Sequence, residues 1–112
     1  MEPSPEDAKL ITLARSSRAR IDAREGAAVR DLDGRTYVAT TVALASLSID
    51  ALALAVAMAV SSGAKGLEAA AIVNDDPANA IIDLSSVRDL AGDGIRVQVA
   101  DLAGNVEAVL ES

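Results

Sequence analysis

The chain has 112 residues, enough for one domain, and 51% of them are hydrophobic, so we expect a packed core rather than disorder. It contains no cysteine and no histidine, which excludes disulfides, zinc–thiolate sites, thiol nucleophiles and histidine-based proton transfer. Residues 36–112 hold three basic and ten acidic residues and thus carry the whole formal net charge of −7. Because an acidic surface repels phosphate groups, neither nucleic acid nor an anionic membrane is an expected partner.

The first 41 residues predict a helix followed by a β-hairpin. Ser4 is suited to cap a helix and Pro5 to its first position, and the helix is expected to continue to about Arg18. Residues 25–41 then form two strand-like runs around Asp33-Gly34, a dipeptide that favours a tight hairpin turn.

A second helix is predicted from Ser48-Ile49-Asp50, with Asp50 as its cap, to about Ser62, where Gly63 ends it. Its residues 51–60 are apolar on every side, and such a helix is expected to be buried on every side. In so small a chain this requires a sheet on one side and another helix or a second subunit on the other. The same stretch is too short to span a bilayer, which takes about 20 residues, and residues 1–5 do not resemble a signal peptide. We therefore expect a cytoplasmic protein without membrane contact.

The second half predicts a strand, a short helix and two further strands. The strand covers Leu67–Val73, and the helix covers Ser85–Leu90 with Asp83 or Ser85 as its cap. The last two strands are Ile95–Ala100 and Val106–Leu110, with a turn between them. The order of elements predicts one α/β domain over residues 1–112, in which helices pack on a mixed sheet of about five strands.

Several segments in this order resemble the small, homotetrameric type of cytidine deaminase. They are Gly26-Ala27-Ala28-Val29 with Asp33-Gly34-Arg35-Thr36-Tyr37, Ala45-Ser46, Ala59-Val60-Ser61-Ser62-Gly63, Ala70–Val73 and Arg88. The resemblance spans roughly residues 5–112. It implies a three-layer fold and assembly into a dimer or tetramer.

The residues that carry the chemistry of that family are replaced in this chain. The resemblance implies a zinc ion held by one His or Cys and two further Cys, with a Glu that moves protons. Aligned on Ala51, the first ligand position is Asp50 and the Glu position is Leu52; aligned on Arg88, Leu84 and Val87 stand at the two thiolate positions. Leucine and valine bind no zinc, so we expect no metal, no cofactor and no catalytic residue.

The substrate-binding motif of the family is also replaced. The segment that grips the nucleoside sugar falls on residues 41–44, where only Thr41 keeps a hydrogen-bonding side chain and Ala43 and Leu44 are apolar. An aromatic residue used against the base falls near Ala23. These substitutions are typical of a site that has been filled with core.

The sequence leaves three functions open. The first is a non-catalytic, oligomeric scaffold or interaction module, with an unidentified protein partner in addition to its own copies. The second is a metal-free sensor of nucleosides or nucleotides, with a pocket lined by Thr41, Asp50 and Ser85. The third, ranked last, is an enzyme that uses a divalent metal on Asp50 or on the pair Asp75 and Asp76.

Overall fold

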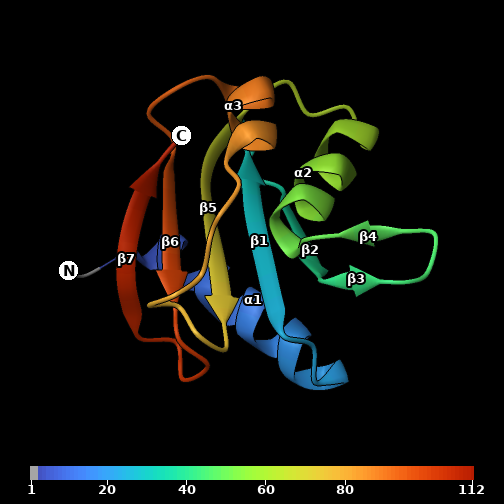
Figure 1. Ribbon diagram of the computed structural model, residues 1–112. Coiled ribbons are helices and arrows are strands. Elements are labelled where there is room, and N and C mark those ends of the chain that lie inside the picture. The colour runs from blue at the N-terminus through green and yellow to red at the C-terminus, as the bar shows by residue number, and fades with distance from the viewer. Residues whose placement is uncertain (1–2) are drawn as a thin grey trace.

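The computed structural model describes residues 3–112, which form three α-helices and seven strands (Figure 1). Met1 and Glu2 lie outside the described residues. The predicted domain of residues 1–112 and the expectation that residues 1–5 are no signal peptide both include these two residues. The elements are α1 Pro5–Ile21, β1 Glu25–Asp31, β2 Thr36–Thr40, β3 Val42–Ala43, β4 Ser48–Ile49, α2 Ala51–Ser61, β5 Leu67–Asn74, α3 Ser85–Ala91, β6 Arg96–Ala100 and β7 Val106–Glu111.

Five strands form one mixed sheet in the order β2-β1-β5-β6-β7. All neighbouring strands are antiparallel except β5 and β6, which run parallel and are connected through α3. Helix α1 covers one face of the sheet, called here the closed face, and α2 and α3 cover the other, called the open face (Figure 1). The predicted three-layer α/β fold is confirmed.

Helix α1 begins as its sequence predicts and ends one turn later. The Ser4 hydroxyl accepts a hydrogen bond from the Asp7 N–H at 3.2 Å, and Pro5 stands in the first turn. The helix continues past Arg18 to Ile21 and stops where Asp22 adopts a left-handed conformation with φ 52°. No glycine marks this end, which is why the sequence did not locate it.

Helix α2 begins at Ala51, and the expected start at Ser48 is wrong. Ser48 and Ile49 instead form β4, which pairs with β3 in a separate two-stranded hairpin. The Asp50 carboxylate accepts a hydrogen bond from the Ala53 N–H at 2.8 Å, so Asp50 caps the helix as predicted. Strands of two residues are too short to show a periodic pattern, and the hairpin was therefore not predicted.

The closed face is a tightly packed layer of small aliphatic side chains. Helix α1 buries Leu10, Ile11 and Ala14 against alanines and valines of the sheet. The helix lies so close to β1 that a Cβ atom on Gly26 would collide with the Ala14 carbonyl oxygen and lie 2.9 Å from Arg18 Cβ. An ion pair of 3.0 Å between Arg30 of β1 and the buried Asp7 adds a polar link between helix and sheet.

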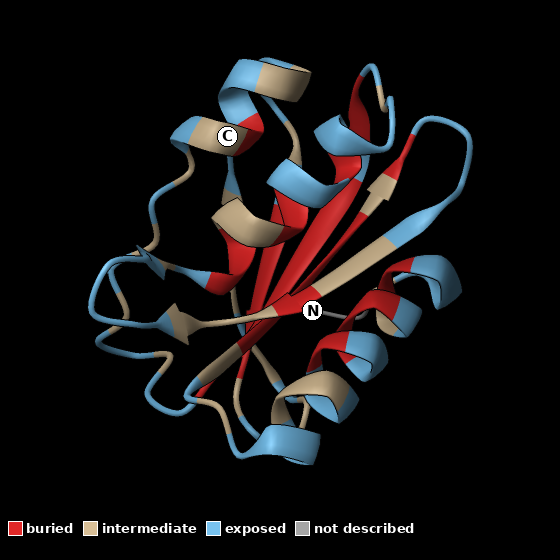
Figure 2. Cartoon of the chain, turned by 90° about the vertical axis from the view of Figure 1, so that its right-hand side faces the viewer, coloured by how far each residue is buried: buried red, intermediate tan, exposed pale blue. Residues whose placement is uncertain are grey.

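The open face buries only the inner side of α2. Ala51, Leu52, Ala55, Val56 and Ala59 are buried, whereas Val60 is 53% exposed. Figure 2 shows the same division, with buried residues toward the sheet and exposed ones outward. Helix α3 covers just part of the outer surface of α2, so of the two covers that the sequence predicted, another helix or a second subunit, the helix alone is not sufficient.

None of the helices formed by residues 3–112 combines the length and the apolar character needed to cross a bilayer.

Candidate functional site

Two of the positions that the sequence analysis aligned with catalytic residues lie in the core of the open face. Leu52, at the proton-shuttle position, is 2% exposed, and Val87, at a thiolate position, is fully buried. Leu84, at the other thiolate position, is half-buried and packs against the same core. None of the three side chains has an atom that can donate to a metal, so the residues present do not fit a zinc ion. Within residues 3–112, no group of three His, Cys, Asp or Glu side chains is placed to hold a metal.

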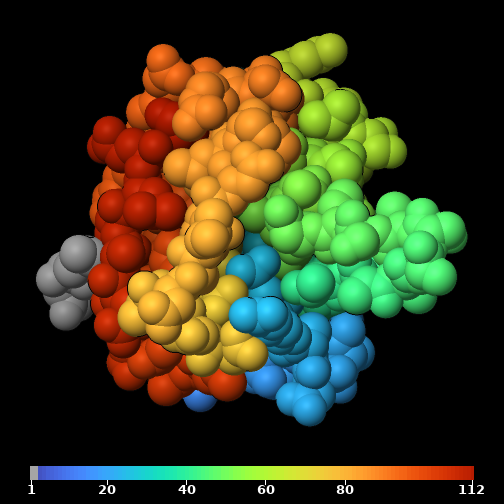
Figure 3. Space-filling view, viewed as in Figure 1, coloured from blue at the N-terminus to red at the C-terminus, as the bar shows by residue number. Residues whose placement is uncertain are grey.

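The segment at the sugar-binding positions is split between two environments. Thr41 is half-buried, and its backbone N–H donates to the Glu25 carbonyl oxygen at 3.2 Å. Ala43 and Leu44 are exposed, the latter by 64%, on the β3–β4 hairpin. This hairpin projects from the body of the molecule (Figure 3), so these two residues do not fill a site.

A cleft of about 360 Å³ remains where β1 and β5 approach the start of α2. It is lined by Arg24, Glu25, Thr41, Asp50, Asn74, Asn79, Ala80 and Ile81. The sequence left open both a filled site and a remaining pocket, and the structure places this cleft outside the replaced core positions. Leu52 and Val87 fill the space near the sheet, while the mouth of the site stays open and polar.

The polar wall of the cleft is organised around Glu25 and Asn74. The Asn74 side-chain amide donates to Glu25 Oε2 at 2.6 Å, and Asn74 Oδ1 accepts from the Asp76 N–H at 2.7 Å. Arg24 Nε pairs with Asp75 Oδ1 at 3.3 Å and links the residue before β1 to the residue after β5. Asn79 donates to both carboxylate oxygens of Asp76 at 3.1 Å.

Partial burial raises the pKa of the Glu25 carboxyl above its ordinary value, because the charged form loses hydration. The negative charge of Asp50 raises this pKa further, and the hydrogen bond from Asn74 opposes the shift. Carboxyl groups whose pKa is raised by burial in a cleft are common in functional sites.

Sequence reasoning found Thr41 and Asp50 but missed Glu25, Asn74 and Asn79. Glu25 begins β1 and Asn74 ends β5, so 49 positions separate two residues that touch. The sequence feature that could have pointed to Glu25 and Asn74 is a polar residue at one end of each apolar strand. That signal alone does not reveal that the two strands are neighbours.

Three further candidates from the sequence have other partners. Ser85 is not among the residues that line the cleft; its backbone N–H donates to Asp83 Oδ1 at 2.9 Å at the start of α3. Hydrogen bonds from the side chain and backbone of Ser85 hold the pKa of the Asp83 carboxyl below its ordinary value. Asp75 and Asp76 are engaged by Arg24 and Asn79, respectively.

Comparison with solved structures shows which known folds share this architecture. The Burkholderia pseudomallei cytidine deaminase matches with a TM-score of 0.74 at 23% identity, over 91% of this chain and 89% of that one. The Mycobacterium leprae cytidine deaminase gives 0.70 at 17% identity, over 92% and 90%. A mutant of the Mycobacterium tuberculosis enzyme gives 0.65 at 22% identity, over 80% and 81%. No curated protein sequence matches this chain.

The profile of the family described as cytidine deaminase-like matches residues 3–104. The chain therefore belongs to the cytidine deaminase-like family, as its sequence motifs predicted.

Proposed function

We propose that this chain is a non-catalytic member of its family that associates with copies of itself and serves as a scaffold or interaction module. The loss of catalysis is supported by the burial of Leu52 and Val87 at the shuttle and ligand positions. Restoring a Glu and a thiolate there would place charged groups inside the core, at a large cost in hydration. A location in the cytoplasm stays a prediction from the sequence.

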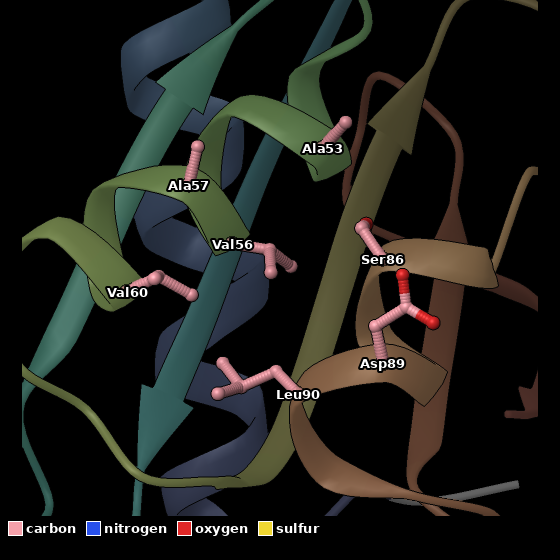
Figure 4. A pocket seen from close by; sticks show the side chains of 7 residues that line it. All are labelled: Ala53, Val56, Ala57, Val60, Ser86, Asp89 and Leu90. Atoms are coloured by element: carbon pink, nitrogen blue, oxygen red, sulfur yellow. The ribbon is translucent and has the colours of Figure 1, made fainter.

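Self-association is supported by the uncovered apolar side of α2. A groove of about 400 Å³ separates α2 from α3 (Figure 4), and its lining residues are Ala53, Val56, Ala57, Val60, Ser86, Asp89 and Leu90. Apolar surface of this kind next to a buried core is typical of an interaction site. A second chain packed on the groove would bury Val60 and the other apolar side chains that line it.

Light scattering on the purified chain tests the association. We expect a mass of two or four chains at micromolar concentration, against 11.4 kDa for one chain. Val60→Lys places a charge in the groove and should shift the mass toward the monomer. Ile21→Lys is the matched control, because Ile21 is 58% exposed at the end of α1, away from the groove. A monomeric wild type, or equal effects of the two variants, would contradict the proposal.

The absence of catalysis is tested separately. Purified protein incubated with cytidine, with and without added zinc, should release no ammonia. Turnover above that of a buffer control would contradict a non-catalytic role.

The open cleft favours a second candidate function, a sensor that binds a small molecule without a metal. Its volume of about 360 Å³ lies within the range of ligand-binding pockets. Of the three lining residues that this alternative named, Thr41 and Asp50 line the cleft and Ser85 does not. Calorimetric titration with nucleosides and nucleotides tests whether the sensor binds these ligands, as the sequence predicted. The absence of binding heat at millimolar ligand would contradict this candidate function.

A further inference from the structure

The cleft at the start of α2 continues into a smaller chamber. The chamber has a volume of about 20 Å³ and shares Glu25, Asp50 and Ile81 with the outer cleft. A space of this size accommodates a single water-sized group. The site therefore suits a ligand with one small head and a wider body.

The charges around the chamber are negative. Glu25, Asp50 and Asp83 line it, and none of the three forms an ion pair within residues 3–112. The single basic residue in the lining of the outer cleft, Arg24, is paired with Asp75. A ligand head that carries a positive charge would offset the repulsion between Glu25 and Asp50.

The hydrogen-bonding groups of the cleft also favour a donor. The side-chain amides of Asn74 and Asn79 already donate to Glu25 and Asp76. By contrast, Asp50 uses Oδ1 alone, toward the Ala53 N–H, and keeps Oδ2 free of partners in the described chain. Asp50 Oδ2 is thus a free acceptor in this wall, and an ammonium group with its three N–H bonds can satisfy it.

Apolar side chains surround these acceptors. Leu52 and Ile72 form the floor of the inner chamber, where low polarity strengthens a charge-assisted hydrogen bond. Ile81 is 98% exposed on the wall of the outer cleft, next to Ala80. A short apolar group on the ligand would cover Ile81 and remove part of that surface from water.

We infer that the cleft binds a small organic cation, a primary ammonium with a short branched apolar body, whose head occupies the inner chamber between Glu25 and Asp50. This inference rests on the second candidate function, a ligand-binding cleft, and is independent of self-association. It differs from the nucleoside ligand of that candidate, because a nucleoside has no positive charge at neutral pH.

Titration of the isotope-labelled chain, followed by NMR at pH 7.5, tests the inference with three probes of one shape. The probes are isopentylamine, isopentanol and isovalerate, with cytidine as a fourth. We expect isopentylamine to shift the backbone amide signals of Glu25, Ala51 and residues 74–83. Hydrogen bonds to charged groups are stronger than those between neutral groups, so the affinity for isopentanol should be lower by a factor of roughly ten or more. Isovalerate, which is negatively charged, should not bind.

Two conservative variants locate the head group. Glu25→Gln and Asp50→Asn each remove one charge while keeping the shape, and Asn remains a good helix cap. Each should weaken isopentylamine binding by roughly tenfold. Asp33→Asn removes the same charge from the opposite end of β1, in the exposed Asp-Gly turn, and should leave the affinity unchanged.

The outcomes separate this inference from the functions on which it builds. Equal or tighter binding of isopentanol or cytidine would overturn it while sustaining a ligand-binding cleft. An equal loss in Asp33→Asn would also overturn it, because the attraction would then come from the overall charge. If none of the four probes binds, the inference falls, while the sensor function is decided by the separate titration with nucleosides and nucleotides, and the oligomer mass measured by light scattering is unaffected.

Discussion

The closed and open faces of the sheet bury similar small aliphatic side chains but leave different surfaces. On the closed face, α1 lies against β1 closely enough to require Gly26, and grooves of about 410 and 190 Å³ are lined by the outer residues of α1 together with Thr36 or the turn before β7. On the open face, α2 leaves an apolar groove toward α3, a polar cleft at its start and a projecting hairpin. The family's catalytic positions all lie on the open face. The closed face therefore provides the closest contact between helix and sheet, and the open face provides the surfaces on which ligand binding or association would act.

The sharpest test of this difference compares one large side chain from each face. Leu10→Ala should lower the free energy of unfolding by about 2–5 kcal/mol, because it leaves a cavity under α1, where Leu10 is fully buried. Met58→Ala on α2 should change it by about 0.5 kcal/mol or less, because Met58 is 39% exposed. Urea denaturation measures both. A similar loss in the two variants would mean that the open face is covered in solution.

The close approach of α1 to β1 predicts the next largest effect. Gly26→Ala should cost about 1–3 kcal/mol, because its Cβ meets the backbone of Ala14, which cannot move without shifting the helix. Gly66→Ala is the control, since its Cβ would meet the tip of the exposed Leu32 side chain, at 3.0 Å. Thermal unfolding followed by far-ultraviolet circular dichroism compares the two, and equal midpoints would refute the tight packing of the closed face.

On the open face, the cap of α2 should contribute a smaller amount. Asp50→Ala removes the acceptor of the Ala53 N–H and should cost about 0.5–2 kcal/mol. Asp50→Asn should recover most of this loss, because Asn caps about as well as Asp. If Asp50→Asn were as unstable as Asp50→Ala, the negative charge rather than the cap would be the contribution that matters.

The smallest expected effect depends on pH and concerns Glu25. Because its pKa is raised in the folded chain, the folded state binds a proton more readily than the unfolded state, and this group reduces stability as pH rises. Glu25→Gln should therefore increase the free energy of unfolding at neutral pH. The gain should disappear below the ordinary pKa of a glutamate, where the wild-type carboxyl is protonated in both states. Urea denaturation across pH 4–8 measures the difference.

Asp31, at the other end of β1, provides the opposite sign as a control. Burial raises the pKa of Asp31, but hydrogen bonds from the Tyr37 hydroxyl and from the backbone N–H groups of Arg35 and Asp33 outweigh it and lower the pKa. Asp31→Asn should therefore be less stable than the wild type at neutral pH, and the deficit should shrink in acid. If Asp31→Asn and Glu25→Gln both increased the free energy of unfolding, the cause would be general repulsion among the negative charges of the chain instead.

The sequence predicted those parts of the fold that are encoded by neighbouring residues. Ser4-Pro5 and Asp50 marked two helix starts, and Asp33-Gly34 marked the turn between β1 and β2. The family motifs, whose order extends along the chain, indicated the three layers. The hairpin of β3 and β4 was missed because each strand has two residues and no pattern.

The cleft was the least predictable part of the molecule. Its wall brings together Glu25, Asn74 and Asn79, which come from the start of β1, the end of β5 and the following loop. Replaced catalytic residues indicated what the site had lost, and Leu52 and Val87 do lie in the core. Whether a space remained depended on where the segment after β5 lies relative to the start of α2, which is a property of tertiary packing.

Tyr37, the one aromatic residue of the chain, gives the molecule an intrinsic optical reporter. Its ring packs against the core of the open face, and its hydroxyl donates to Asp31 at 2.8 Å. All near-ultraviolet dichroism and intrinsic fluorescence of the protein must therefore come from a single ring on β2. Loss of that signal reports the loosening of side-chain packing around β2 directly, while far-ultraviolet dichroism follows the whole backbone. The two signals together can show, without any label, whether the open face loosens before the rest of the sheet.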